Sequence, residues 1–367
     1  MVNKRNKLRA ARRVVAVLAT CLIVAYLLAP QLAGVRLELL ARINLGYLVF
    51  GIALEAAFLI AYACLTTAVL PRPGPGLRTV ARINLSTLAV SHVVPGGTAA
   101  GTAVGYRLLT QSGVRGTDAC FALGTQGLGS AVVLNVILWV TLVVSIPLRG
   151  FNARYATAAV IGTILIGLCV GLLLLLTRGE ARAAKTMRRL ARRLRFLDED
   201  SLHRGVHHLA DRLAAMRADR PLMVRAFAWA AAAWLLDAAS LGVFLAAFGH
   251  RVSPDGLLIS FGLANVIAAI PITPRGLGVM EAVLIPSLIA FGTPHEVAVL
   301  GVIAYRLFNF WAPIPIGGAA YLSLRRKLPA RNAKDEQARA RAGPSGAPVE
   351  SPGEWAVRHR IEVGSRA

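Results

Sequence analysis

Val94-Pro95-Gly96-Gly97 and Pro271-Ile272-Thr273-Pro274-Arg275-Gly276 interrupt two hydrophobic stretches of this chain, at residues 80–109 and 256–291. A Pro/Gly break within a membrane segment is costly unless the freed backbone groups are buried in protein or line a wet cavity. Paired breaks at corresponding positions in two halves of a chain indicate a transporter's binding site. We therefore expect each stretch to form two half-helices that enter and leave the membrane on the same side.

The rest of the chain is apolar enough for a polytopic membrane protein. Of its 367 residues, 56% are hydrophobic, and several segments exceed the roughly 20 apolar residues that a membrane-spanning helix needs. The expected fold class is therefore an all-α membrane protein with two re-entrant broken-helix hairpins and about six full transmembrane helices, at residues 14–30, 43–70, 118–147, 155–177, 222–248 and 295–324.

The formal net charge of +23 does not indicate a nucleic-acid partner, because most of the basic residues lie in three blocks, 1–13, 178–220 and 325–367. Basic blocks beside membrane spans mark the cytoplasmic side and attract anionic lipids. We expect a plasma-membrane protein with both termini in the cytoplasm. Its expected parts are a basic N-terminus (1–13), a transmembrane domain (14–327) that contains a basic amphipathic cytoplasmic loop (178–221), and a disordered tail (328–367).

The two halves of the chain share one order of landmarks. Pro274 lies 179 residues after Pro95, and the same shift carries the start of span 43–70 onto the start of span 222–248. The order span, broken hairpin, span therefore occurs twice. The first hairpin is predicted to enter from the cytoplasm and the second from outside, which is the layout of an inverted repeat.

The breaks favour an anion site. Gly96-Gly97-Thr98 is expected to open one second half-helix, with Thr98 as its cap, and Pro274 suits the first turn of the other. Free backbone N–H groups and the positive ends of two helix dipoles would then meet near the bilayer midplane. Gly97, Gly101 and Gly105 form a smooth stripe, for which close helix packing and close ligand approach are equally good interpretations.

Charged residues within these segments need a partner or water, because a charge in the bilayer costs about 2.5–3.5 kcal/mol. For Arg275, Glu281 and Arg306 we weigh a structural ion pair against contact with a lipid headgroup, whereas Arg107 could instead snorkel to the cytoplasmic interface. Glu55 and Asp237 are either cavity residues or partners of the arginines, and His92 is expected to end a half-helix.

The sequence contains no motif for a metal, a nucleotide or a redox cofactor. Its four cysteines lie in hydrophobic segments without ligand spacing, and an ATP-binding P-loop is missing. We expect no cofactor and no metal ion.

The chain resembles the flippase-like family named for the transmembrane region of lysylphosphatidylglycerol synthase, over about residues 10–325. The resemblance rests on Val94-Pro95-Gly96-Gly97 with Gly101 and Arg107, on Pro271-x-x-Pro274-x-Gly276-Leu277-Gly278-Val279-Met280-Glu281, and on Tyr305-Arg306-Leu307 followed by Trp311-x-Pro313. It implies a lipid-handling protein, and synthase activity is not expected because no soluble aminoacyl-transfer domain is seen. Members usually carry Gly where this chain has Arg275.

The leading hypothesis is a carrier that moves a phospholipid or lipid-linked headgroup between leaflets. Its partners would be membrane lipids with anionic or phosphate-bearing headgroups. Alternatives are an accessory subunit of an envelope-synthesis enzyme and, with less support, a membrane-embedded lipid transferase. The predicted substrate-binding residues are Pro95, Gly96, Gly97, Thr98, Gly101, Arg107, Pro274, Arg275, Gly276, Gly278, Glu281, Tyr305 and Arg306, and no catalytic residue is predicted.

Overall fold

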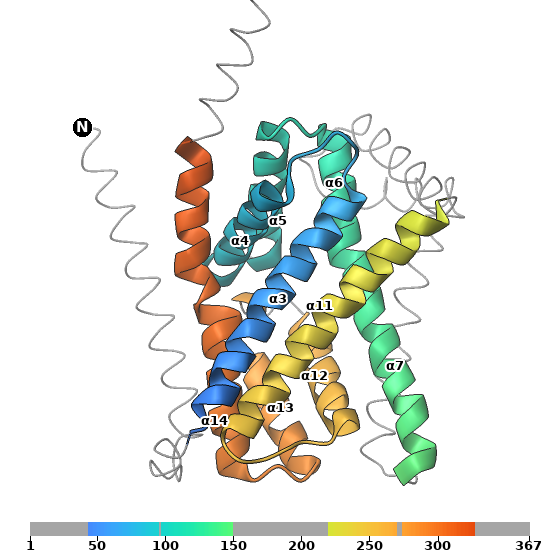
Figure 1. Ribbon diagram of the computed structural model, residues 1–367, viewed down its shortest axis with the longest axis vertical. Helices are drawn as coiled ribbons and strands as arrows, with labels where there is room; N and C mark the ends of the chain where they lie inside the picture. The colour runs from blue at the N-terminus through green and yellow to red at the C-terminus, as the bar shows by residue number, and fades with distance from the viewer. Residues whose placement is uncertain (1–42, 95–96, 150–218, 270–273, 327–367) are drawn as a thin grey trace, which may run out of the picture. The chain divides into compact units, whose positions relative to one another are not determined.

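The computed structural model describes residues 43–94, 97–149, 219–269 and 274–326, and every regular element within these ranges is helical (Figure 1). Contacts divide the chain into two units, Met1–Tyr321 and Leu322–Ala367. Of the second unit, residues 322–326 are described, and they are helical. The predicted all-α class is confirmed for the described part of the chain.

Four helical stretches are long and apolar enough to cross a membrane. A 25-residue helix rises about 37 Å, which exceeds the roughly 30 Å of a bilayer's hydrocarbon core. These stretches are Leu45–Val69 (α3), Gly116–Ser145, Arg220–Ala247 (α11) and His295–Arg326, and they coincide with four of the six expected spans. The other two expected spans, 14–30 and 155–177, lie outside the described residues, as do the N-terminal block, nearly all of the loop 178–221 and the tail 328–367.

Local sequence explains where several of these helices begin. The side chain of Asn44 accepts a hydrogen bond from the backbone N–H of Gly46 at 3.0 Å and so caps α3. Asp219 caps α11 through the N–H of Leu222, also at 3.0 Å, and a proline stands in the first turn of that helix.

Two of the long stretches contain a π-helical segment. Gly116–Gly124 (α6) runs through Thr125–Gly129 (η1) into Ser130–Arg149 (α7). His295–Arg306 (α14) runs through Leu307–Trp311 (η3) into the helical residues 313–326. A π segment shifts the side chains that follow it around the helix, and such segments are frequent at functional sites.

Each π segment presents a carboxamide to a neighbouring helix. In η1, Gln126 Nε2 donates to Thr66 Oγ1 of α3 at 2.6 Å. In η3, Asn309 Nδ2 donates to Asp237 Oδ1 of α11 at 2.9 Å. The two spans that occupy matching places in the predicted repeat therefore share a local feature that the sequence analysis did not anticipate.

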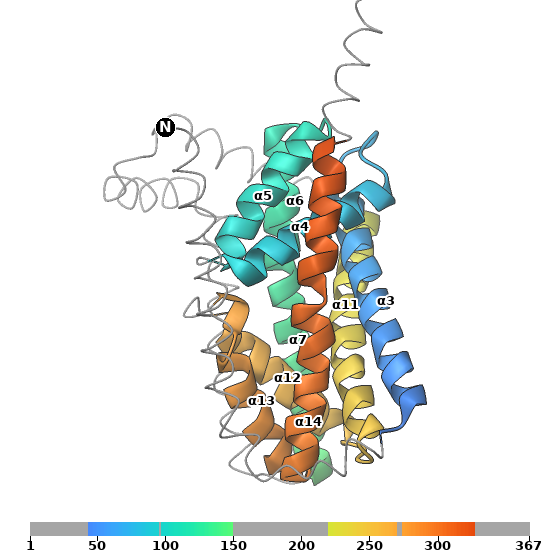
Figure 2. The same ribbon diagram turned by 90° about the vertical axis from the view of Figure 1, so that its left-hand side faces the viewer.

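Each interrupted hydrophobic stretch forms a pair of short helices. The first pair is Leu77–Val93 (α4) and Gly97–Gln111 (α5), and the second is Pro254–Ala268 (α12) and Val279–Ala290 (α13). In Figures 1 and 2 the first pair lies beside the end of α3, and the second lies toward the beginning of that helix. The 15-residue helix α12 rises only about 22 Å, so it is too short to cross a bilayer alone.

The second break differs from the expectation in detail. Pro274 opens a short 3-10 turn, Pro274–Gly276, and α13 begins only at Val279. The reason lies in the backbone, since Arg275, Gly276 and Gly278 all have positive φ values, of 45°, 70° and 80°. A right-handed helix cannot continue through such residues.

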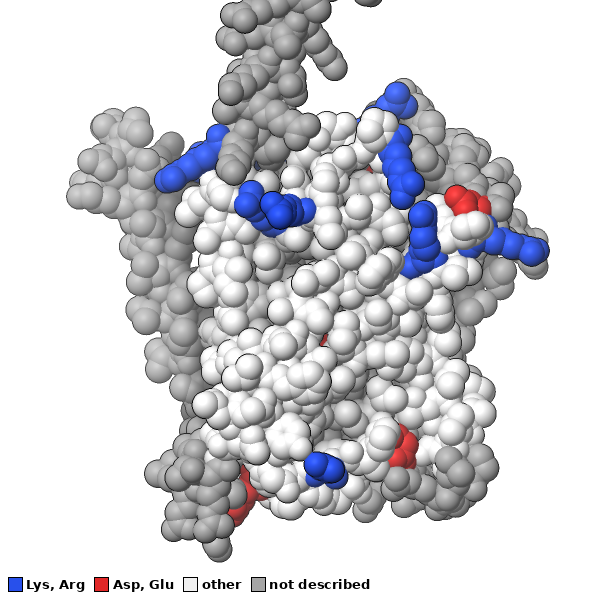
Figure 3. All heavy atoms as spheres, in the orientation of Figure 1, with Lys and Arg blue, Asp and Glu red and all other residues white. Residues whose placement is uncertain are grey.

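The helices pack closely through small residues. α3 and α11 form the most extensive helix pair, and a Cβ atom on Gly51 of α3 would come within 2.8 Å of the Phe244 ring of α11. A buried apolar core joins α11, α12, α13 and α14. On the face that Figure 3 shows, a broad and almost uncharged band separates charged side chains at the two ends, which is the pattern of a surface in contact with lipid.

Candidate functional site

A buried ion pair joins the second hairpin to α14. Arg306 Nε lies 2.6 Å from Glu281 Oε1, and the two side chains are only 6% and 8% exposed. The other oxygen of Glu281 accepts a hydrogen bond from the N–H of Gly278 at 2.7 Å. The carboxylate therefore sits at the N-terminus of α13, where the helix dipole favours a negative charge, and holds Arg306 at the same point.

The guanidinium of Arg306 is only partly satisfied. Its Nη1 faces the sulfur of Met280 at 3.5 Å, a weak acceptor, and its Nη2 is buried without a hydrogen-bond partner among the described residues. Its Cζ lies 4.6 Å from the centroid of the Phe310 ring, and that ring stacks on His92 of α4 at 4.4 Å. One strong donor close to the end of α4 is therefore buried without an acceptor in the described part of the chain.

A second group of polar side chains connects α3, α11 and α14 with η3. Tyr305 donates to Asp237 Oδ1 at 2.7 Å, and Ser240 donates to Glu55 Oε1 at 2.5 Å. Asn309 Nδ2 donates to both carboxyl groups, at 2.9 Å to Asp237 and 3.4 Å to Glu55. The two buried carboxyl groups are thus held by neutral donors, and the open alternative of a direct pair with an arginine is not what the structure shows.

Arg275 lies at the tip of the second hairpin, half-buried and in the left-handed region of backbone space. The turn that carries it packs against α4 and α5. No hydrogen bond or ion pair joins its side chain to another residue in the described ranges. Arg275 is therefore the second cation of the site, and unlike Arg306 it has no carboxylate partner in the described part of the chain.

The predicted binding residues divide into two groups. Gly278, Glu281, Tyr305 and Arg306 join the buried cluster through the contacts above, with Arg275 beside them. Buried Gly276 could not carry a side chain, because a Cβ there would lie 2.5 Å from the Cβ of Ala268. Pro274 begins the 3-10 turn that positions these residues.

No hydrogen bond or ion pair joins the described residues predicted from the first break to the cluster, although α5 packs against the turn Pro274–Gly276. Gly97 begins α5 with a φ of 39°, Thr98 is exposed on its first turn, and Arg107 is exposed farther along. Gly101 faces α4, where a Cβ would lie 2.6 Å from the carbonyl oxygen of Thr87. Gly101 therefore permits close helix packing. Pro95 and Gly96 lie outside the described residues.

Seven side chains of the cluster were not among the predicted binding residues. The sequence singles out Glu55, His92 and Asp237 for their charge or position without a binding role, and the others are Ser240, Met280, Asn309 and Phe310. Two of these last four had a detectable signal. Ser240 follows Asp237 by three positions, and Asn309 follows Arg306 by three, so each lies on the same helix face as a charged residue. The spacing identifies the two positions but not their partners, because both side chains donate to Glu55 of α3, and Asn309 also donates to Asp237 of α11.

The described residues contain no group of three His, Cys, Asp or Glu side chains that could hold a metal ion. The chemistry present is that of charge and hydrogen bonding. One buried and one half-buried guanidinium group, three buried carboxyl groups and several neutral donors lie where the long apolar helices meet the two pairs of short helices. This arrangement can bind a polar group and exclude bulk solvent from it.

Comparison with known proteins gives a family and two relatives. The sequence model of the lysylphosphatidylglycerol synthase TM region matches residues 13–317. A protein of Methanothermobacter thermautotrophicus named "UPF0104 membrane protein" is 22% identical over 286 residues, which cover 75% of this chain and 84% of that protein. A second match to a protein of that name and organism is 30% identical over 84 residues, 23% of this chain and 25% of the relative.

Proposed function

Because the chain belongs to the lysylphosphatidylglycerol synthase TM region family, we propose that it is a lipid transporter of the cell membrane. It moves a phospholipid or another lipid with a phosphate-bearing headgroup between the two leaflets. The acyl chains stay in the bilayer, and the headgroup crosses along the buried polar cluster. The lipid leaves chemically unchanged, and the movement does not use ATP.

The observation that carries the proposal is the buried Arg306 Nη2, which has no hydrogen-bond partner among the described residues. Leaving a buried donor without an acceptor costs about 1–3 kcal/mol, and more when the donor belongs to a charged group. A phosphate oxygen is the natural acceptor, because guanidinium and phosphate form short charge-assisted hydrogen bonds. Arg275, half-buried at the hairpin tip, supplies a second positive charge for the same anion.

Glu281 has two roles in this proposal. Its carboxylate neutralises Arg306 in the absence of lipid, so that the empty site does not hold an isolated buried charge. When the lipid phosphate binds to Nη2, Nε remains with Glu281. A headgroup that also carries an amine can contact the same carboxylate, which accommodates aminoacylated as well as anionic lipids.

The pairs α4/α5 and α12/α13 provide the path. We propose that they are re-entrant hairpins, entering from opposite faces as the two halves of an inverted repeat, with their broken ends near the bilayer midplane. Broken helices of this kind form the binding sites of many secondary transporters. The long helices support this placement: Glu55 and Asp237 lie in the interior of α3 and α11, away from both ends.

The experiment is lipid movement in liposomes that contain only the purified protein. The probes are labelled phosphatidylglycerol, phosphatidylcholine and an aminoacylated phosphatidylglycerol, and the readout is the fraction of label in the outer leaflet. Protein-dependent movement of at least one of them is expected, with an unchanged lipid mass. If the leaflet distribution of every probe is the same with and without protein, the proposal is wrong.

The decisive variant is Arg306→Lys, which keeps a positive charge for Glu281 but lacks the Nη2 donor. Transport is expected to fall about tenfold or more, since one charge-assisted hydrogen bond is lost. Arg251→Lys is the matched control, because Arg251 is exposed and donates to Tyr47 at 3.0 Å. If the two variants transport lipid equally well, Arg306 does not bind the headgroup.

A further inference from the structure

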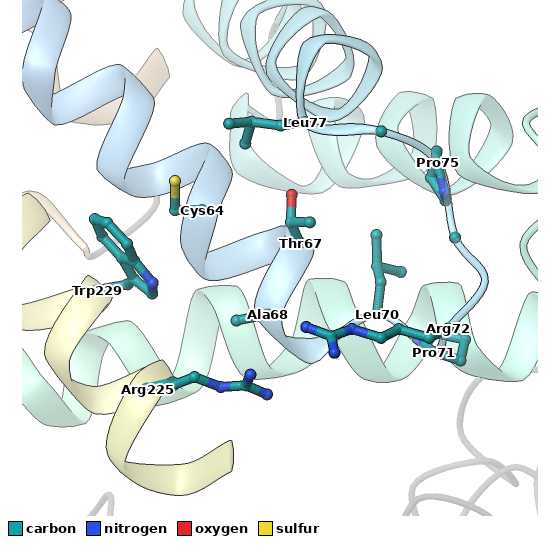
Figure 4. A pocket seen from close by; sticks show the side chains of 12 residues that line it. Cys64, Thr67, Ala68, Leu70, Pro71, Arg72, Pro75, Leu77, Arg225 and Trp229 are labelled. Carbon is teal, nitrogen blue, oxygen red and sulfur yellow. The ribbon is translucent and has the colours of Figure 1, made fainter. Parts of the chain in front are cut away.

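A pocket of about 410 Å³ lies at the end of α3, away from the buried cluster. Its walls are the last turns of α3 with Cys64 and Thr67, the loop 70–76, and the first turns of α11 with Arg225 and Trp229 (Figure 4). This volume is within the range of small-ligand sites. Because α3 ends and α11 begins here, the pocket lies at the level where a span leaves the hydrocarbon.

Two arginines, one from the loop and one from α11, line this pocket. Figure 4 shows that Arg72, from the loop, and Arg225, from α11, extend from opposite sides toward the same end of the pocket. Both are exposed, and neither forms a hydrogen bond or an ion pair within the described ranges. Two guanidinium groups that converge in this way repel each other, and an anion between them removes the repulsion.

The rest of the lining is apolar and suits the upper part of a lipid. Leu70, Leu77 and Trp229 form walls beside the arginines. Tryptophan is enriched at the membrane interface, where its ring lies among the headgroups and the first carbons of the acyl chains. The pocket thus places two cations at headgroup level directly beside apolar surface. A small soluble anion would contact the arginines but not the apolar walls.

We propose that this pocket binds the phosphate of an anionic phospholipid from the adjoining leaflet, with Arg72 and Arg225 as its ligands and Trp229 against the glycerol and acyl region. It is a static lipid-binding site, separate from the transport site. The proposal does not depend on transport, because Arg72 and Arg225 make no contact with the Glu281–Arg306 pair.

Cys64 gives a direct test, because it lines the pocket and is a free thiol. The full chain with Cys21, Cys120 and Cys169 replaced by serine is purified in detergent, and the rate of Cys64 alkylation by a maleimide is measured. Added phosphatidylglycerol is expected to slow alkylation, whereas diacylglycerol, which has no phosphate, is not. Protection by inorganic phosphate alone, to the same extent as by the lipid, overturns the assignment to a lipid.

The variant Arg72→Gln/Arg225→Gln is expected to need about tenfold more phosphatidylglycerol for half-maximal protection, in line with the loss of charge-assisted hydrogen bonds. Arg78→Gln is the matched control, because Arg78 is an exposed arginine in the first turn of α4 that does not line the pocket. If the double variant and Arg78→Gln respond equally to the lipid, the site does not exist. Lipid retained by each variant in native mass spectrometry provides the second readout, which does not depend on the thiol.

Discussion

At the scale of single residues, the contribution of the Glu281–Arg306 pair to stability can be separated from its contribution to lipid transport. Removing one member of a buried pair leaves an uncompensated charge and costs about 3 kcal/mol, whereas replacing both is far less damaging. We therefore expect Arg306→Gln to unfold at a lower temperature than the double variant Glu281→Gln/Arg306→Gln. The double variant should fold normally and still fail to move lipid, which the liposome assay and thermal unfolding in detergent measure together. A double variant that transports would show that the pair serves stability alone.

Arg275 gives a second residue-scale prediction, because its φ of 45° is unfavourable for any residue with a side chain. The left-handed region costs such a residue about 1–2 kcal/mol. Arg275→Ala and Arg275→Gly both remove the charge, but only glycine also relieves the backbone. We expect the glycine variant to be more stable than the alanine variant by roughly 1 kcal/mol, with the same reduction of transport in both. Equal stability of the two variants in thermal unfolding would show that the backbone is not strained.

At the scale of elements, the α4/α5 pair depends on the absence of a side chain at Gly101. A Cβ atom there would lie 2.6 Å from the carbonyl oxygen of Thr87, which belongs to the backbone of α4 and cannot turn away. Gly101→Ala is expected to lower the free energy of unfolding by about 2 kcal/mol, as overpacking does. Gly124→Ala is the control, since a Cβ at Gly124 meets nothing within 4 Å. Thermal unfolding of the two variants decides the question, and equal stability would mean that α4 and α5 are not packed as described.

The helices also show which features of the fold could be predicted from the sequence. Apolar runs and Pro/Gly breaks are local signals, so four long spans and two interrupted stretches could be predicted from them. The start of α13 at Val279 could not be predicted, because positive φ values at three of the four residues 275–278 depend on close packing of the turn, as at Gly276 against Ala268.

Pairing between charged residues depends on which helices touch. Glu281 and Arg306 could be predicted as site residues because each charge within an apolar segment needs a partner or water. That Asp237 binds Tyr305 and Asn309 in place of an arginine follows from the contact of α11 with α14 and from the π segment that turns Asn309 toward it. No local pattern in the sequence encodes that contact.

At the scale of the whole molecule, the proposed inverted arrangement fixes which loops share a face of the membrane. If both helix pairs are re-entrant, the loop before α4 and the turn after α5 face one side, and the loop before α12 and the turn after α13 face the other. Single cysteines at Gly74 and Thr117 should then react with a membrane-impermeant maleimide from the same side. Cysteines at Arg251 and His295 should react only from the opposite side. All four positions are exposed, and the background is the full chain with its four native cysteines replaced by serine.

Intact cells and inverted vesicles supply the two directions of labelling, and a lysed sample gives the total for each position. The positive-inside rule further predicts that Gly74 and Thr117 are the cytoplasmic pair, because Arg72, Arg78 and Arg115 stand beside them. If Gly74 and Thr117 label from opposite sides, the stretch between them crosses the membrane, the two halves are not inverted, and alternating access between them is lost as a mechanism. If both pairs label as expected, the buried cluster lies between two hairpins that open toward different leaflets, which is the geometry that exchange of a headgroup between leaflets requires.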